Sequence, residues 1–319
     1  TYTSAITVNE IPAADFTFIN QCFGTAIPFT DASTINAPSV IAGWAWDFDG
    51  DLAPDDVTQN PTFNFPAAGN YTVGLGVQSD AGCVNAVTHQ VTVYANPVAN
   101  FTAAAVCEGT TTAFVNTTTG NPNAWTWDFG DVSPIDNTQN PTHAYAASNT
   151  YNVQLSVTTA NGCTHDTTKA VNVNPIPVAD FSGTDVCETA QSVFTDNSSV
   201  AAPAAITDWD WDFDNNGSID NTTQNPSYVF PVDGTHDVLL TVTSTGGCTD
   251  NMLVTVTVFP GVVSDFTFTN VCLNEVTDFT DQSTVTSGII ISWDWDYGDL
   301  TANGTVSYTH LTLPTNREV

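Results

Sequence analysis

Short stretches rich in aspartate recur directly after pairs of tryptophans, and their carboxylates are the groups in this sequence best suited to chemistry. In the first stretch, acidic residues stand at alternate positions around Gly50, and the third stretch repeats the pattern around Gly217. Alternating oxygen ligands with a glycine at the sharp turn are what a hard cation such as Ca²⁺ requires. The sequence therefore predicts calcium ligands at Asp47, Asp49, Asp51 and Asp55 in the first stretch, at Asp212, Asp214, Asn216 and Asp220 in the third, and, with fewer candidates, at Asp128 and Asp131 in the second.

The same carboxylates could instead serve a structural purpose. Aspartate side chains often accept hydrogen bonds from backbone amides within turns. A complete calcium loop also ends in a glutamate that binds the ion through both oxygens, and none of the three stretches contains one. A cation site and an aspartate-rich turn are therefore both open interpretations of these stretches.

Groups suited to acid–base or nucleophilic catalysis show no repeated arrangement. No serine, histidine and aspartate recur in a fixed order, and paired cysteines would leave no thiol nucleophile. The five histidines fall at unrelated places in the sequence: His89, His143, His165, His236 and His310. We therefore predict that the chain is not an enzyme.

An internal repeat of 80 to 85 residues determines where these groups stand. A phenylalanine that opens each repeat occurs at Phe16, Phe101, Phe181 and Phe266. All eight tryptophans fall in four Trp-x-Trp pairs, at Trp44/Trp46, Trp125/Trp127, Trp209/Trp211 and Trp293/Trp295. A Thr-Gln-Asn-Pro motif recurs at residues 58–61, 138–141 and 223–226. Self-similarity at a fixed period indicates a tandem array of modules.

The repeat also gives the cysteines a pattern. Each full repeat has one cysteine shortly after its first strand and one in a Gly-Cys step, and Cys272 begins a fourth repeat. Pairing within each repeat treats all repeats alike, whereas buried free thiols are the alternative. The expected disulfides are therefore Cys22–Cys83, Cys107–Cys163 and Cys187–Cys248.

Within each repeat the apolar residues alternate with polar ones, as they do in a half-buried strand. The runs 71–77 and 151–157 show this pattern, and Asn161-Gly162 is suited to a tight hairpin between two such runs. Short strands separated by turn signals, in repeats of this length, indicate an antiparallel β-sandwich. Alternation places Trp44, Trp46 and Phe48 on one face, where we expect the core rather than an exposed sugar-stacking strip.

These motifs resemble the polycystic-kidney-disease (PKD) type domain. The closest match is Trp-Thr-Trp-Asp-Phe-Gly-Asp at residues 125–131, followed by the Asn-Pro segment at 140–145, and the resemblance covers residues 14–305. Repeats one and three depart from the family pattern, with Asp49 and Asp214 where it usually has glycine. The added cysteine pair is similar to PKD-type repeats of long secreted bacterial surface proteins. The resemblance implies an all-β chain of tandem antiparallel immunoglobulin-like sandwiches in a linear array, with adhesive, spacer or accessory roles.

The repeat boundaries give the expected domain organisation. The stretch 306–315 matches no part of the repeat and is similar to a translated adapter of short-read sequencing libraries, so we interpret it as non-native. The expected parts are the last strand of a preceding module at 1–12, full modules at 13–96, 97–176 and 177–261, a truncated module at 262–305 and the non-native tail at 306–319.

Charge and hydropathy restrict the possible partners. The net charge is −32, from 34 acidic residues and two basic ones, so nucleic acid and anionic membranes are poor partners. No apolar run is long enough to insert into a membrane, and 41% hydrophobic residues argue against disorder.

We therefore expect a secreted, extracellular or cell-surface repeat region that acts as a structural spacer and binds an extracellular protein or polysaccharide. The alternative is the substrate- or carbohydrate-binding accessory region of a large secreted hydrolase. Ca²⁺ is the only cofactor that the sequence predicts.

Overall fold

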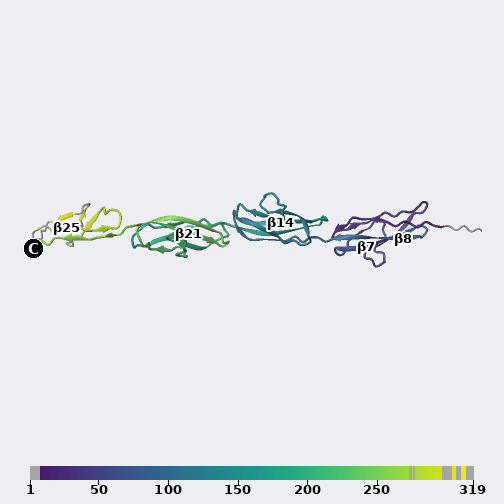
Figure 1. Cartoon of the computed structure of the whole chain (residues 1–319), viewed down its shortest axis with the longest axis horizontal. Coiled ribbons are helices and arrows are strands. Elements are labelled where there is room, and N and C mark those ends of the chain that lie inside the picture. The colour runs from purple at the N-terminus through teal and green to yellow at the C-terminus, as the bar shows by residue number, and fades with distance from the viewer. Residues whose placement is uncertain (1–7, 273–274, 276, 297–303, 307–309, 314–319) are drawn as a thin grey trace, which may run out of the picture. The chain divides into compact units, whose positions relative to one another are not determined.

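The computed structural model describes residues 8–272, 275, 277–296, 304–306 and 310–313. These residues form strands, turns and bends but no helix, and hence no helix that could cross a membrane. The expected all-β fold of tandem sandwiches is confirmed, and Figure 1 shows the strands gathered into separate sandwiches. By its contacts the chain divides into two compact parts, residues 1–173 and 174–319.

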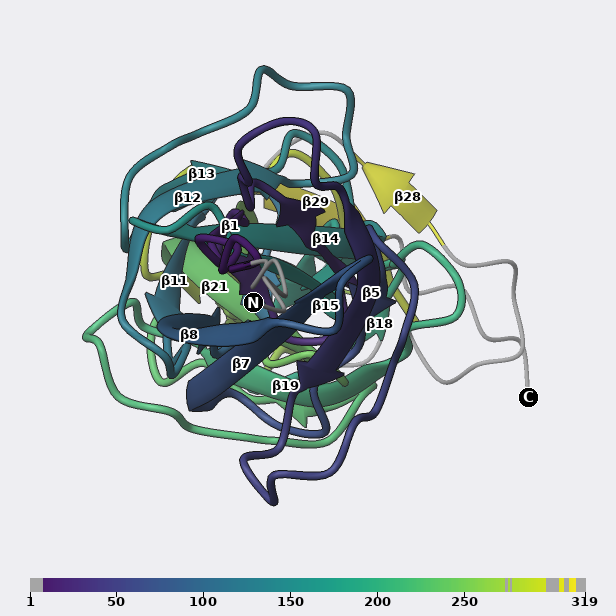
Figure 2. The ribbon, with the colours of Figure 1, turned by 90° about the vertical axis from the view of Figure 1, so that its right-hand side faces the viewer.

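The first module consists of two facing sets of strands. A four-stranded sheet has the order β2-β8-β7-β5, and the short pairs β1-β4 and β3-β6 face it. Figure 2 shows β7 and β8 side by side with β5 next to them. The strands are β1 (Phe16–Thr17), β2 (Gln21–Cys22), β3 (Ile27–Pro28), β4 (Thr30–Asp31), β5 (Ile41–Asp47), β6 (Thr62–Phe63), β7 (Gly69–Ser79) and β8 (Val84–Tyr94).

The second and third modules repeat this arrangement, with four-stranded sheets β10-β15-β14-β12 and β17-β22-β21-β19. The second module comprises β9 (Phe101–Ala103), β10 (Val106–Cys107), β11 (Thr111–Asn116), β12 (Pro122–Asp128), β13 (Thr142–Ala144), β14 (Asn149–Thr159) and β15 (Thr164–Asn174). The third comprises β16 (Phe181–Gly183), β17 (Val186–Cys187), β18 (Ser192–Asp196), β19 (Ile206–Asp212), β20 (Ser227–Tyr228), β21 (Gly234–Ser244) and β22 (Thr249–Phe259).

A fourth set of strands follows. Here β24 pairs with β25, β25 with β29, and β27 with β28. The strands are β23 (Val262–Val263), β24 (Phe266–Phe268), β25 (Thr277–Asp281), β26 (Thr284–Val285), β27 (Trp293–Trp295), β28 (Gly304–Val306) and β29 (His310–Leu313). The proposed module boundaries and the non-native origin of residues 306–319 stay predictions, and residues 1–7 of the expected preceding strand lie outside the described residues.

Each of the first three modules has its own aromatic core. In β7 the alternation of the sequence becomes alternation of burial, with Val73, Leu75 and Val77 buried. Trp46 is fully buried, and its ring centroid lies 5.1 Å from that of Phe16 in an edge-on contact. The same contact recurs at 5.1 Å in the second module and 4.9 Å in the third. The tryptophan strand therefore forms the core, as predicted, with Trp44 only half-buried at its margin.

The Thr-Gln-Asn-Pro motif holds this core in place. The indole Nε1 of Trp46 donates to the carbonyl oxygen of Thr58 at 2.9 Å, and the equivalent bonds measure 3.0 and 2.9 Å in modules two and three. Asn60 Oδ1 accepts the backbone N–H of Asp31 at 2.9 Å, again as in the other two modules. The motif therefore satisfies a buried indole and a strand amide, both of which would be costly to leave unpaired.

A disulfide joins two different modules, and the expected pairs Cys22–Cys83, Cys107–Cys163 and Cys187–Cys248 are wrong. Cys22 of the first module is bonded to Cys163 of the second, with their Cα atoms 5.5 Å apart. Cys107 and Cys248 are also disulfide-bonded. The free thiols among the described residues are Cys83, Cys187 and Cys272.

Strand geometry explains the correction. Cys22 lies beside Tyr94, the last residue of β8, because β2 runs parallel to the end of that strand. Cys83 directly precedes Val84, the first residue of β8. A strand of this length spans about 35 Å, whereas the Cα atoms of a disulfide lie within about 7 Å. The two cysteines of one module are therefore at opposite ends of it, and bonding between successive modules treats all repeats alike just as well.

Candidate cation sites

The loop after β5 brings together three carboxylates of the first module. One oxygen from each of Asp47, Asp49 and Asp51 lies within 4.8 Å of the others. Two ligands about 2.4 Å from one calcium ion lie at most about 4.8 Å apart, so these oxygens fit one shared ion. Asp55 is not in the group, and its Oδ2 accepts the backbone N–H of Phe48 at 2.7 Å.

The same carboxylates also accept backbone hydrogen bonds. The two oxygens of Asp47 accept the N–H groups of Gly50 at 2.7 Å and Leu52 at 2.9 Å. Asp51 accepts the N–H of Ala53 at 2.8 Å. Since a carboxylate offers about four lone-pair positions, these amide contacts leave room for a cation. The turn interpretation of the sequence is thus present in the geometry and does not compete with the cation interpretation.

The loop after β19 in the third module forms a second group, from Asp212, Asp214 and Asp220. Asp212 is 6% exposed, and its oxygens accept the N–H groups of Asn216 at 3.1 Å and Gly217 at 2.7 Å. Burial acts to raise the pKa of Asp212, but these amide hydrogen bonds outweigh it and hold the pKa below its ordinary value. Its carboxylate therefore remains charged and available to a cation at neutral pH.

The other two predicted ligands of this loop make backbone contacts. Asn216 Oδ1 accepts the N–H of Ser218 at 2.8 Å, and Asp220 Oδ2 accepts the N–H of Phe213 at 2.8 Å. Asp220 thus makes the same backbone hydrogen bond that Asp55 makes in the first module. Unlike Asp55, it also belongs to the cluster of three carboxylates. Each of these two modules therefore brings three of its four predicted ligands together, although not the same three positions of the repeat.

The second module does not form an equivalent group among the described residues. Asp131 Oδ2 lies 2.7 Å from His143 Nε2, and the His143 ring stacks on Phe129 with centroids 4.1 Å apart. Burial acts to raise the pKa of Asp131, but hydrogen bonds from Ser133 and His143 hold it below its ordinary value. Asp128 instead accepts the N–H of Gly130 at 2.9 Å. A histidine partner thus replaces the carboxylate neighbours, and sequence reasoning had assigned no role to His143.

Gly130 explains why this loop takes another course. It occupies the position of Asp49 and Asp214 and has a φ of +76°, which side-chain-bearing residues rarely adopt. A Cβ atom at Gly130 would lie 2.6 Å from the carbonyl oxygen of Asn152 in β14. The close approach to the sheet needs glycine, so the departure of repeats one and three from the family pattern marks the loops that gather carboxylates.

Basic side chains do not neutralise these groups in the part of the chain that the structure describes. Lys169 is the only lysine in the sequence, and its Nζ donates to the carbonyl oxygen of Phe101 and lies 5.2 Å from that ring. Lys169 stands at the position of the repeat that His89 occupies in the first module, where the His89 ring contacts Phe16. The one lysine therefore contacts Phe101 of the core and not the acidic loops.

The histidines with described side chains have separate partners. His89 lies 2.9 Å from Asp15, and His165 Nδ1 accepts the N–H of Ala99 at 3.1 Å. His236 Nε2 lies 2.9 Å from the carbonyl oxygen of Val232. These contacts anchor strands and turns, and the side chain of His310 lies outside the described residues.

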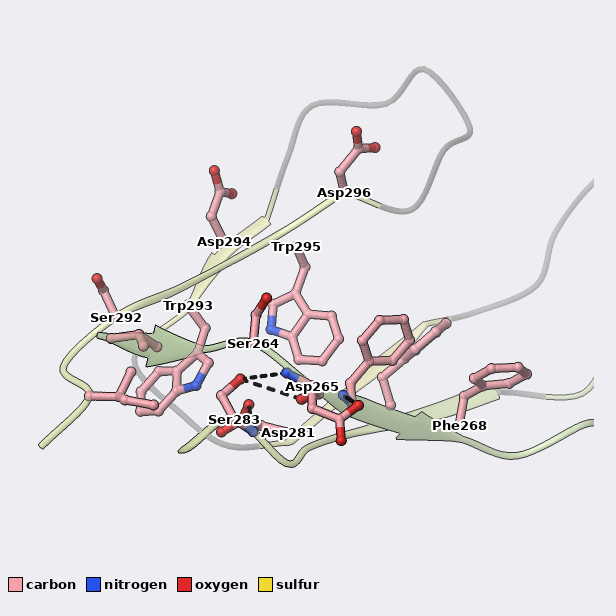
Figure 3. A pocket seen from close by; sticks show the side chains of 14 residues that line it. Ser264, Asp265, Phe268, Asp281, Ser283, Ser292, Trp293, Asp294, Trp295 and Asp296 are labelled. Atoms are coloured by element: carbon pink, nitrogen blue, oxygen red, sulfur yellow. Dashed lines mark hydrogen bonds between the residues drawn. The ribbon is translucent and has the colours of Figure 1, made fainter. Parts of the chain in front are cut away.

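A cavity of about 690 Å³ opens in the fourth set of strands. Figure 3 shows Trp293 and Trp295 facing it, while Asp294 and Asp296 point away. Phe266 and Trp295 meet edge-on at 5.5 Å, as the core pair Phe16 and Trp46 does in the first module. The cavity is therefore an uncovered aromatic core, since the described residues there include no counterpart of the long β7–β8 hairpin.

Comparison with known proteins identifies the repeats. The PKD domain family matches three successive segments of the chain, residues 9–93, 94–175 and 172–259.

Solved structures of similar fold include the PKD1 domain of Vibrio anguillarum Epp, at 26% identity over 27% of this chain and 96% of that one, with a TM-score of 0.24. The three N-terminal domains of the bacteriophage RB49 highly immunogenic outer capsid protein match at 10% identity over 79% of this chain and 99% of that one, with a TM-score of 0.41. Fibronectin(III)-like modules of Clostridium thermocellum CbhA match at 14% identity over 51% of this chain and 94% of that one, with a TM-score of 0.32.

Proposed function

Because the chain belongs to the PKD domain family, we propose that it is a non-catalytic extracellular repeat region of a surface or secreted protein, in which the modules act as structural spacers and as interaction surfaces. Disulfide bonds support this location, since they persist in oxidising compartments. The net charge of −32 disfavours nucleic acid and anionic membranes and leaves an extracellular protein or polysaccharide as candidate partners. Of these two we propose an extracellular protein, because the aromatic side chains between residues 8 and 261 form no repeated exposed face.

The inward orientation of the aromatic side chains is the observation that carries the spacer role. Sugar binding through stacking needs exposed rings, repeated on one face if every module takes part. Between residues 8 and 261, the only exposed Phe, Tyr or Trp side chains are those of Phe23 and Phe259. They stand at different places in the repeat, Phe23 after β2 and Phe259 at the end of β22. This distribution favours spacing over sugar recognition, and with it the structural role over the accessory region of a hydrolase.

We also infer that the two clusters of three carboxylates, in the loops after β5 and β19, each bind Ca²⁺. Asp47, Asp49 and Asp51 would hold one ion, and the group of Asp212, Asp214 and Asp220 another. The fit rests on the oxygen spacing and on the chemistry of the donors, since carboxylates suit a hard cation. A bound ion would offset the repulsion between neighbouring carboxylates and so fix the loops after β5 and β19.

Electrophoresis of the chain through gels that contain soluble polysaccharides tests the proposed role. We expect mobility equal to that in a plain gel, and no clearing of the polysaccharide after staining. Retardation that disappears in a Phe23→Ser or Phe259→Ser variant would show a sugar-binding surface and overturn the spacer role. Clearing of the polysaccharide by the chain would overturn its non-catalytic character.

A further inference from the structure

Two kinds of cysteine recur in the modules. The strand cysteines follow the first strand of each module (Cys22, Cys107, Cys187 and Cys272), and the hairpin cysteines directly precede the last long strand (Cys83, Cys163 and Cys248). The disulfide between Cys22 and Cys163 joins a strand cysteine to the hairpin cysteine of the next module.

Bonded and free strand cysteines have the same backbone position. Cys22 pairs with Tyr94 at the end of β8, and Cys187 pairs with Phe259 at the end of β22, both in parallel register. In each case the next N–H donates to the carbonyl oxygen of that partner, at 2.8 Å and 2.7 Å. Cys187 is exposed, so its thiol is accessible at the end of its module.

Bonded and free hairpin cysteines also share one position. The carbonyl oxygen of each accepts the N–H of the residue that ends the preceding long strand, at 2.9 Å in all three modules. The glycine before each cysteine has a φ between 76° and 85°. The free Cys83 is therefore held in a turn of the same geometry as the turn that holds the disulfide-bonded Cys163.

The sulfur atoms show what the hairpin position faces. Cys248 Sγ lies 3.9 Å from the carbonyl oxygen of Asn174, the last residue of β15. Cys83 Sγ lies 4.0 Å from the carbonyl oxygen of Asn9, and each of these carbonyls is 74 residues before its cysteine. The free Cys83 thus faces the segment that leads into its module, as the bonded Cys248 does.

We propose that a disulfide from each strand cysteine to the next hairpin cysteine is a repeating link along the array. Cys107 then bonds to Cys248, which is 141 residues further along the chain, the same separation as between Cys22 and Cys163. Cys83 is the bonding site for the strand cysteine of a PKD module placed before it. Cys187 is the bonding site for the hairpin cysteine of a module placed after it.

Each link forms by thiol–disulfide exchange with a disulfide donor, either an oxidoreductase or a small disulfide. One protein thiolate attacks the donor disulfide to give a mixed disulfide and releases one donor thiol. The second protein thiolate then attacks the protein sulfur of that mixed disulfide and releases the other donor thiol. Two protein thiols lose two protons and two electrons, and the donor is reduced to two thiols.

Peptide mapping of the whole chain tests the first part. The chain is oxidised with glutathione disulfide, free thiols are labelled with maleimide, and the chain is cut with pepsin in acid, since two basic residues give trypsin few sites. We expect linked peptides for Cys22 with Cys163 and for Cys107 with Cys248, and label on Cys83, Cys187 and Cys272. A peptide linking two cysteines of one module would overturn the proposal.

A longer chain tests whether Cys187 is a bonding site. Residues 97–261 are inserted a second time after residue 261, with Cys187→Ser in the inserted copy. We expect two reactive thiols in the native oxidised protein, Cys83 and Cys272, because the original Cys187 bonds to the inserted Cys163. A matched chain with Cys163→Ser in the inserted copy should show three. Four reactive thiols in the first chain, with both the original Cys187 and the inserted Cys163 labelled, would show that Cys187 does not accept the next module.

Discussion

Calcium binding is a property of individual carboxylates, and Asp212 is the residue that tests it best, since it is buried, charged and part of the oxygen group of the third module. Extracellular modules bind Ca²⁺ with dissociation constants of about 10⁻⁴–10⁻³ M. An ion at a hundredfold excess over its dissociation constant stabilises the folded state by about 2.7 kcal/mol. We expect this gain with Ca²⁺ but not with Mg²⁺ at equal ionic strength, and its loss from the third module in an Asp212→Asn/Asp214→Asn variant, measured by thermal unfolding.

General screening of the acidic surface is the competing effect and needs a matched control. Asp208 and Asp210 lie in β19 of the same module but outside the oxygen group. Replacing both by asparagine removes the same charge, so this variant should keep the full response to Ca²⁺. Equal stabilisation by both ions, or an equal response in both variants, would leave the loops as ordinary aspartate-rich turns.

A single residue also leaves one indole without a partner. Trp44 Nε1 donates to Asp31 at 2.8 Å, and the same bond in the third module measures 2.7 Å. In the second module Asn116 occupies the position of Asp31, and Trp125 Nε1 is buried with no hydrogen-bond partner. An Asn116→Asp substitution should restore the bond and raise the free energy of unfolding by about 1 kcal/mol. Hydrogen exchange of the β12 amides would measure this gain locally.

The pH dependence of this gain follows from the aspartates already present. Burial acts to raise the pKa of Asp31, but hydrogen bonds from Ser33 and Trp44 outweigh it and lower the pKa. A carboxyl group with a lowered folded-state pKa adds stability above its unfolded-state pKa of about 3.9 and loses it as the pH falls through the folded value. The Asn116→Asp gain should therefore be complete at pH 7 and fade below about pH 4. A gain that persists in acid would mean that the new side chain acts without its charge.

At the scale of the element, loop conformation decides whether a module gathers carboxylates. Gly130 has a positive φ that residues with a side chain rarely adopt, and it lies so close to β14 that a Cβ atom would clash with the backbone there. A Gly130→Asp substitution restores the residue type of the other two modules, but we expect it to destabilise the second module by about 1–3 kcal/mol and to add no response to Ca²⁺. Gly109→Asp is the control, because Gly109 has a similar φ of 74° and no atom within 4 Å of its Cβ position. Equal losses of stability, or a gained calcium response, would contradict this account.

Elements with a strong local pattern could be predicted from the sequence, and those defined by tertiary contacts could not. The alternation in 71–77 and 151–157 gave β7 and β14, because one face of each strand is buried. The two-residue strand β2 has no pattern to detect, yet its parallel pairing with the end of β8 places Cys22 at the junction with the next module. The disulfide prediction failed for that reason. The contact of Asp131 with His143, in place of further carboxylates, could not be predicted from the sequence either, since it depends on a loop that folds back onto β14.

At the scale of the whole molecule, the disulfide between Cys22 and Cys163 limits how far the chain can be extended. It closes a loop of 141 residues across two modules, which stabilises them by roughly 5 kcal/mol in the chain-entropy model. Under tension the closed loop bears no load, so a spacer linked in this way stays short even when its modules unfold.

Single-molecule stretching measures this limit directly. The chain is held at its two ends, in a variant whose only cysteines are Cys22 and Cys163. Full unfolding should release about 490 Å less chain in the oxidised form than in the reduced form, since 141 residues at about 3.5 Å each remain inside the loop. Adding Cys22→Ser should abolish the difference between oxidising and reducing buffer. Equal lengths in both buffers for the two-cysteine variant would show that the link between modules does not form in solution, and the spacer would then resist extension only through the stability of its separate cores.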